Sequence, residues 1–226
     1  MALPKLDHAI FTHFLVGLNR KIQYRAFTVR EQKILLHAKQ SEDPQQIIDA
    51  MKQIVNQCIL DEDIDVTDLP FFDLEDMFMR IRAKSVSEYC EIGYKDKETD
   101  KSIKVKINID DVKVQTTEGH SSTIMLTDIL GVKMRYPNID DITSNMQNDD
   151  LLLRCIDCVF DEEQVYKLAD EPREEVEQWI DDLGIEEQKK LYEFFETTPR
   201  LRYEHKIKLG DYEETLVFEG LEDFFT

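Results

Sequence analysis

Alternation between apolar and polar residues changes period several times along the chain, which predicts a mixed α+β fold. Residues 10–27 are apolar in two short runs on either side of Leu18-Asn19-Arg20, a pattern typical of a β-hairpin. A helix is expected from Thr28 to about Gln40. Thr28 and Glu31 stand at the spacing of a capping box, in which each side chain satisfies a backbone N–H of the first turn.

The clearest helical pattern follows, and it begins at Asp43-Pro44, a helix cap followed by proline at the first helical position. Its apolar residues recur at helical spacing on one face: Ile47, Ile48, Met51, Ile54, Val55, Cys58 and Ile59. Residues 60–72 form an acidic connector that lacks the central glycine and the final glutamate of a calcium loop, so a solvated loop is favoured. Asp73 is expected to cap the next helix, with Met77, Phe78 and Ile81 on one side.

From Ser85 the apolar period becomes two. Residues 103–109 alternate isoleucine and valine with lysine and asparagine, and residues 112–114 and 123–126 add two further strand candidates. Residues 86–136 are therefore predicted to form antiparallel sheet with one packed and one solvated face. Gly131 to Pro137 ends this region, because the residue before a proline disfavours continued regular structure.

Helical spacing returns after residue 137. Helices are expected over about 139–146, 149–160, 172–183 and 185–197, with Trp179 on the apolar face of the third. Alternation around Gly210-Asp211 then predicts a terminal hairpin. The fold class is thus α+β: an N-terminal hairpin and helices (1–84), a central antiparallel sheet (85–137), and C-terminal helices that close with a β-hairpin (138–226), in one or two compact domains.

Two apolar segments have no obvious place in this scheme. The connector contains Leu69, Phe71 and Phe72, and the chain closes on Leu221, Phe224 and Phe225. Large apolar side chains near a chain end dock either on the protein's own core or on a partner. Both interpretations stay open, and these six residues are the candidate partner-binding residues.

Composition limits the function classes. The chain has 226 residues with a net charge of −20, from 28 Lys and Arg against 48 Asp and Glu. Such a charge repels nucleic acid and anionic membranes, so neither is expected as a partner. Neither a signal peptide nor an apolar run of membrane-spanning length is recognisable, which favours an intracellular protein.

The residues predict no active site. There is no glycine-rich phosphate loop and no G-x-S-x-G motif, and the five histidines are scattered. Cys155 and Cys158 form a C-x-x-C pair, which leaves a zinc- or thiol-dependent protein as an alternative. The same cysteines fit a buried helix face, because free cysteine is often a small core residue. A second alternative is an acidic DNA mimic that blocks a DNA-binding protein.

Four stretches resemble a known family. They are FTVREQKILLHAKQSEDPQQIIDAMKQIVNQCI (27–59), LPFFDLEDMFMRIRAKSVSEYCEIGY (69–94), ILGVKMRYP (129–137), and FFETTPRLRYEHKIKL with LVFEGLEDFF (within 194–225). Together they resemble the baseplate hub subunit and hub-assembly proteins of T4-type contractile-tailed bacteriophages. The resemblance spans nearly the whole chain.

The resemblance implies a non-enzymatic protein that helps to form the baseplate hub by binding other phage tail and hub proteins, with self-association as a further option. It would act in the host cytoplasm as a transient chaperone or stay in the tail baseplate as a hub component, and both roles stay open. Relatives carry zinc-ribbon-like cysteine pairs at turns where this chain has Asp96-Lys97-Glu98-Thr99 and Gly210-Asp211-Tyr212. Without those ligands, neither a metal nor another cofactor is expected.

Overall fold

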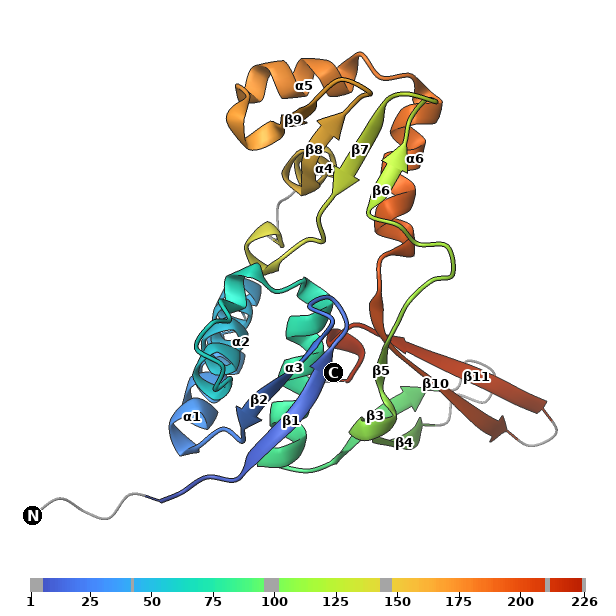
Figure 1. Ribbon diagram of the computed structural model, residues 1–226. Helices are drawn as coiled ribbons and strands as arrows, with labels where there is room; N and C mark the ends of the chain where they lie inside the picture. The colour runs from blue at the N-terminus through green and yellow to red at the C-terminus, as the bar shows by residue number, and fades with distance from the viewer. Residues whose placement is uncertain (1–5, 42, 96–101, 143–147, 210–211, 225–226) are drawn as a thin grey trace, which may run out of the picture. The chain divides into compact units, whose positions relative to one another are not determined.

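The computed structural model describes residues 6–41, 43–95, 102–142, 148–209 and 212–224. The chain divides into two compact units (Figure 1). Unit 1 combines Met1–Gln115 with Arg200–Thr226, and unit 2 comprises Thr116–Pro199. The two ends of the chain therefore belong to the same unit, which the linear pattern of elements does not reveal.

Unit 1 begins with the predicted hairpin, which is confirmed. Strands β1 (Ile10–Leu15) and β2 (Arg20–Arg25) pair antiparallel, from Ile10 opposite Arg25 to Leu15 opposite Arg20. Leu15, Ile22 and Tyr24 are buried on the inner face of the hairpin.

Three helices pack behind this hairpin. Helix α1 (Val29–Ser41) starts as predicted, because Glu31 accepts a hydrogen bond from the Thr28 backbone N–H at 2.6 Å. Helix α2 (Pro44–Cys58) is capped by Asp43, whose carboxylate accepts from the Gln45 N–H at 3.0 Å. Helix α3 (Phe71–Ser85) is the central helix of the unit, since residues 72–81 are all buried.

The prediction that Asp73 caps α3 is wrong. The helix starts two residues earlier, with Pro70 at the cap position and no side-chain cap hydrogen bond. Asp73 is fully buried and instead accepts three backbone hydrogen bonds from the turn between β1 and β2. A capping pattern can be recognised from neighbouring residues, whereas these hydrogen bonds join residues more than fifty positions apart. The sequence alone therefore favours a capping role for Asp73.

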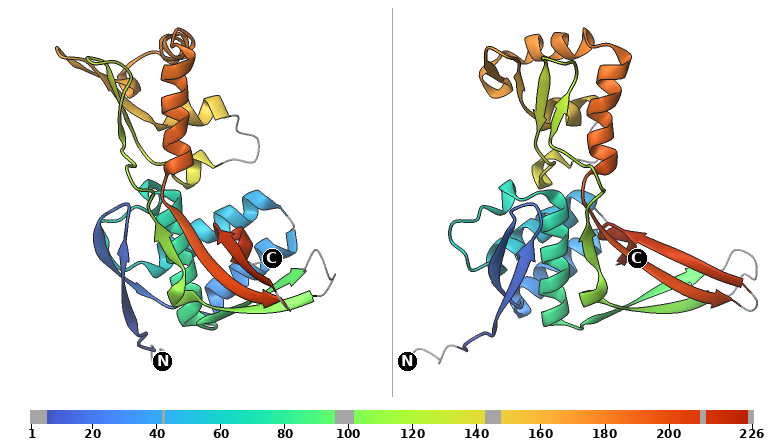
Figure 2. Two further views of the ribbon diagram at one scale, coloured as in Figure 1. Left: turned by 90° about the vertical axis from the view of Figure 1, so that its right-hand side faces the viewer. Right: turned by 45° about the vertical axis from the view of Figure 1, so that its right-hand side comes forward.

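Two long hairpins complete unit 1 and project from it on the same side (Figure 2). Strand β3 (Tyr89–Lys95) pairs with β4 (Ser102–Asn108), and β10 (Arg200–Leu209) pairs with β11 (Tyr212–Glu219). The predicted terminal hairpin is confirmed, although its tip at residues 210–211 lies outside the described residues, as do residues 96–101. The Tyr94 hydroxyl links the hairpins by donating to both carboxylate oxygens of Glu214 at 3.1 Å.

The strands expected in 86–136 exist and are antiparallel, but they belong to three sheets. The β3–β4 pair stands alone, and β5 (Lys113–Gln115) joins the edge of β10 to give the order β11-β10-β5. Strands β6 (Thr123–Met125) and β7 (Gly131–Met134) enter unit 2. Period-two alternation reports strand character but does not identify the pairing partner, which explains the difference. The segment boundaries drawn at residues 84 and 137 do not coincide with the unit boundaries.

Unit 2 is a four-stranded antiparallel sheet of order β6-β7-β8-β9 with helices packed against it. Strands β8 (Ile156–Phe160) and β9 (Val165–Lys167) complete the sheet. The helices are α4 (Asn148–Cys155), α5 (Arg173–Asp181) and α6 (Ile185–Thr197). The core between sheet and helices includes Val132, Leu152, Leu191 and Phe194.

The helix expected over 149–160 is wrong in its second half. Helix α4 ends at Cys155, and the chain continues directly into β8, a central strand that pairs with both β7 and β9. Ile156, Cys158 and Val159 are buried in that strand, and a short apolar run of this kind fits a buried helix and a central strand equally well. The helix expected over 139–146 is, in its described part, only a 3₁₀ turn at Ile139–Asp141. The helices expected near 172–183 and 185–197 are confirmed.

Candidate functional site

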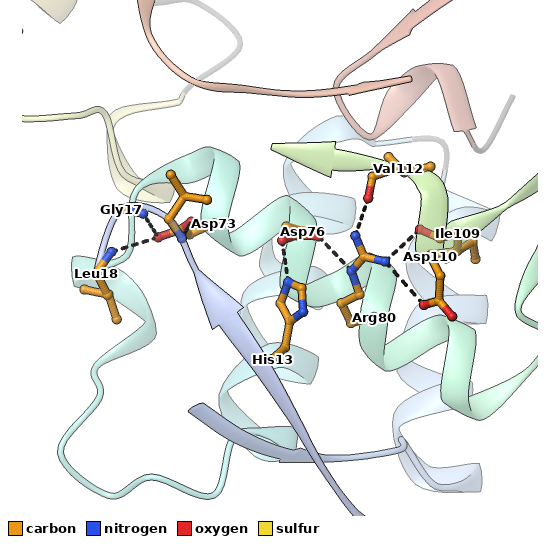
Figure 3. A network of polar contacts seen from close by, with 10 residues as sticks. His13, Gly17, Leu18, Asp73, Asp76, Arg80, Ile109, Asp110 and Val112 are labelled. Carbon is orange, nitrogen blue, oxygen red and sulfur yellow. Dashed lines mark hydrogen bonds and ion pairs between the residues drawn. The ribbon is translucent and has the colours of Figure 1, made fainter. Parts of the chain in front are cut away.

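A network of buried polar groups lies on helix α3 and joins it to β1 and to the segment before β5 (Figure 3). Arg80 donates from Nε to Asp76 at 2.9 Å and from its two terminal nitrogens to the carbonyls of Ile109 (2.7 Å) and Val112. The second Asp76 oxygen lies 2.6 Å from Nε2 of His13. All the polar atoms of this buried guanidinium therefore have acceptors, and its role is to hold three chain segments together.

A second carboxylate on α3 holds the turn that follows β1. Asp73 accepts the backbone N–H groups of Val16, Gly17 and Leu18 at 3.1, 2.9 and 3.3 Å. The approach is close: a Cβ added at Gly17 would lie 2.6 Å from the Asp73 Oδ2 atom. Burial of Asp73 raises its pKa to about 6, because the loss of hydration outweighs the three hydrogen bonds that favour the charged form.

A third carboxylate on α3 holds the C-terminal tail. Glu75 is buried and accepts the Leu221 backbone N–H at 2.7 Å. Gly220 precedes this contact with a φ of 67°, a left-handed conformation that favours glycine. Burial, with a smaller contribution from the nearby acidic groups of Glu222 and Asp76, raises the pKa of Glu75 to about 7.

The structure places most of the candidate partner-binding residues in the core of unit 1. Leu69, Phe72, Leu221 and Phe224 are buried, Phe71 is partly buried, and Phe225 lies outside the described residues. Phe224 belongs to a 3₁₀ turn (Glu222–Phe224) and lies 6.0 Å from Phe218, measured between ring centroids. Partner binding by these residues stays a prediction, and it would require the tail to leave α3.

One edge of the β1–β2 hairpin is covered by the chain itself. Gln23 accepts a hydrogen bond at its carbonyl from the Leu60 N–H (2.9 Å), and its own N–H donates to Asp61 (2.6 Å). Both backbone groups of Gln23 therefore point away from β1. Gln23 pairs with Thr12, and opposite residues of an antiparallel pair either exchange both hydrogen bonds or neither. The N–H and C=O of Thr12 must then point outward on the other edge.

That other edge of β1 is open. The backbone N–H and C=O groups of a strand alternate in direction from one residue to the next. Ile10 and Phe14, each two residues from Thr12, therefore present these groups on the same edge as Thr12. No strand of the described residues other than β2 pairs with β1. All three side chains are exposed, Ile10 to 62% and Phe14 to 44%. An unpaired edge with exposed apolar residues is a template for another strand unless it is protected.

A groove of about 530 Å³ runs beside this edge. Its walls are β1, with Phe11 to Phe14, and the first residues of β5, with Lys113 and Val114. Its floor includes Asp76, Arg80 and Lys84 of α3. Lys84 lies 5.8 Å from the centre of the Phe11 ring and 2.5 Å from Glu88. The groove thus offers backbone hydrogen-bonding groups and aromatic surface, features that suit an extended peptide. Its charged lining is mixed, with Asp110 beside Lys113.

The described residues show no cluster of metal ligands and no reactive thiol in the C-x-x-C pair. No group of three or more His, Cys, Asp or Glu within the described ranges could hold a metal ion. Cys155 and Cys158 are both buried, and burial raises the pKa of the Cys155 thiol to about 12. A thiol of that kind is a poor nucleophile, which disfavours the thiol-dependent alternative.

No helix in the described part of the chain is long and apolar enough to cross a membrane.

Residues 8–226 match the family model described as T4 bacteriophage base plate protein. The chain belongs to this family. The match covers nearly the whole chain, both units included, and agrees with the resemblance found in the sequence. Searches of curated proteins and of solved structures found no significant match.

Membership of the base plate family indicates a structural role in the tail baseplate of a phage, among other baseplate proteins. The open edge of β1 is a structural feature that the sequence analysis missed. A signal was present: Ile10, Phe11, Phe14 and Leu15 place apolar residues on both faces of a strand whose outer face would otherwise be polar.

Proposed function

We propose that this base plate family protein acts in formation of the baseplate hub, as an assembly chaperone or as a hub component, by binding other phage tail proteins. The family match over residues 8–226 is the observation that carries the proposal. The protein would act in the host cytoplasm while the tail is assembled. Its contribution is non-enzymatic: it offers surfaces on which partner segments are held in place.

The open edge of β1 is the contact surface that we assign to this role. An extended segment of a partner would lie in the groove and add a strand beside Ile10, Thr12 and Phe14. Main-chain hydrogen bonds would provide affinity, and Phe14 with the groove aromatics would select apolar side chains at alternate positions. The charged lining residues of the groove are of both signs, and Arg80 and Lys84 already pair with acidic residues, so apolar contacts rather than charge would select the partner strand.

Affinity purification of the tagged full chain from infected cells, followed by mass spectrometry, tests the proposal. The wild-type protein is expected to capture baseplate hub proteins. Thr12→Pro removes an outward N–H while it leaves the hydrogen bonds to β2, and Phe14→Lys removes the apolar contact. Both variants are expected to lose most of the captured partner and to keep the wild-type circular dichroism spectrum.

The matched control is Val217→Lys on β11, where the native side chain is 45% exposed, close to the 44% of Phe14. It introduces the same charge on another strand of unit 1 and should not alter capture. Capture of no phage tail protein by the wild type would refute the assembly role. Equal capture by all variants would leave the role standing and move the contact away from β1.

A further inference from the structure

Unit 2 contains a second surface with a different chemistry. A hollow of about 350 Å³ opens between helix α5 and the edge strand β9. In Figure 1 both elements are labelled in the same part of the molecule. The hollow has apolar walls, formed by Trp179 and Val176 of α5, Leu168 of the turn after β9, Tyr166 of β9 and Leu130 before β7.

These walls are the flank of the core of unit 2. Leu130, Leu168, Val176 and Trp179 are partly buried and pack against the core cluster. Their other surfaces line the hollow, so apolar area remains in contact with water. The expectation that Trp179 lies on the apolar helix face therefore holds, but its ring also forms part of an open surface.

The charged residues that line the hollow are all acidic. Asp161, Glu171 and Glu175 are its only charged lining residues, as far as the described chain shows. Asp161 is held in place because its carboxylate accepts the N–H groups of Glu163 and Gln164 at 2.8 Å each. Those hydrogen bonds lower the pKa of Asp161, so it is charged at neutral pH.

The charge of the whole unit has the same sign. Residues 116–199 contain 7 Lys and Arg against 21 Asp and Glu, so this unit carries −14 of the −20 of the chain. A partner that approaches the hollow meets a negative potential, which attracts cations and repels acidic segments and nucleic acid. Burying an apolar side chain between Trp179 and Leu168 while placing cations beside Glu171 and Glu175 satisfies both features at once.

We infer that the hollow at Trp179 binds a basic segment of another protein, in which a bulky apolar side chain is flanked by lysine or arginine. The apolar side chain enters between α5 and β9, and the flanking cations pair with Asp161, Glu171 and Glu175. The inference adds the partner chemistry of a second contact to the proposed role in assembly and rests on that role only for its biological setting. The groove beside β1 has acidic and basic lining residues, whereas the charged lining of this hollow is all acidic, so only the hollow favours a basic segment.

The chain supplies its own reporter, because Trp179 is its only tryptophan. The full-length protein is titrated with a short peptide that alternates leucine and lysine, and the fluorescence of Trp179 is recorded at physiological salt. A saturable shift of the emission is expected. A peptide with glutamate in place of lysine should cause no shift, and a peptide with serine in place of leucine should bind at least about 10-fold more weakly, since it loses apolar burial.

Matched variants separate a site from diffuse attraction. Glu171→Gln with Glu175→Gln removes two charges at the hollow and is expected to weaken binding about 3- to 10-fold. Glu186→Gln with Glu193→Gln removes two exposed charges from α6, which does not line the hollow. It should change affinity less than about twofold, because charges beyond about 8 Å are screened at this salt.

Three results would overturn the inference: no shift with any peptide, equal weakening by both double variants, or equal binding of the serine peptide. Each leaves the proposed role in hub assembly untouched, because that role is tested by capture from infected cells. Conversely, peptide binding by the purified protein would stand even if no hub protein were captured.

Discussion

Glu75 offers a direct test of how the C-terminal tail is held on α3. The residue is 7% exposed, its carboxyl group accepts the backbone N–H of Leu221, and burial raises its pKa from 4.5 to about 7. Between these two pH values, Glu75 is therefore protonated in the folded state and ionised in the unfolded state. Stability from this group is complete below pH 4.5 and is lost as the pH rises to about 7.

The size of this effect follows from the shift. A pKa difference of one unit is equivalent to 1.36 kcal/mol. The difference between 4.5 and about 7 therefore corresponds to about 3 kcal/mol in the free energy of unfolding. Measurements are best confined to pH 5.5–8, above the isoelectric point near 4.6. Over this pH range, the free energy of unfolding of unit 1 should fall by about 2 kcal/mol because of Glu75.

Glu75→Gln keeps an oxygen acceptor for the Leu221 N–H but cannot ionise. The variant should lose this pH dependence and should be more stable than the wild type at pH 8 by up to about 3 kcal/mol. Urea unfolding followed by circular dichroism measures the change. Fluorescence of Trp179 follows unit 2 separately and should not change with this substitution.

The control is Glu62→Gln, which removes an exposed carboxylate from the same unit and should leave the slope unchanged. Asp73, whose pKa is raised to about 6, contributes a slope of the same sign at lower pH and remains in the variant. Parallel pH profiles of wild type and Glu75→Gln would refute the reasoning. So would fast hydrogen exchange of the Leu221 amide in the wild type at pH 5.5.

Other substitutions test the remaining contacts. Arg80→Met removes the cation that pairs with buried Asp76 and should cost about 3 to 5 kcal/mol, measured by urea unfolding; a cost below about 1 kcal/mol would contradict a buried ion pair. Phe224→Ala should destabilise unit 1 by about 3 kcal/mol, which distinguishes a core residue from a partner contact, since a solvent-facing grip would leave stability unchanged. Thiol titration of the native protein should find Cys155 unreactive until denaturant is added, and prompt labelling would place it outside the core.

Elements with local signals could be predicted from the amino-acid sequence alone. Asp43-Pro44 and the apolar face that follows specify α2, and alternation specifies the terminal hairpin, because cap chemistry and side-chain period act within a few residues. The four stretches of similar sequence likewise pointed to the family to which the chain belongs.

Features that depend on residues distant in the sequence became visible only in the folded chain. Asp73 resembles a cap in the sequence but serves a turn more than fifty residues away, and Ile156 starts a strand because β7 and β9 lie on either side of it. The tail residue Leu221 finds its acceptor, Glu75, 146 positions earlier. Both proposed contact surfaces have the same origin. The open edge of β1 and the hollow at Trp179 exist because neighbouring segments cover some faces and leave others exposed, which only the folded chain settles.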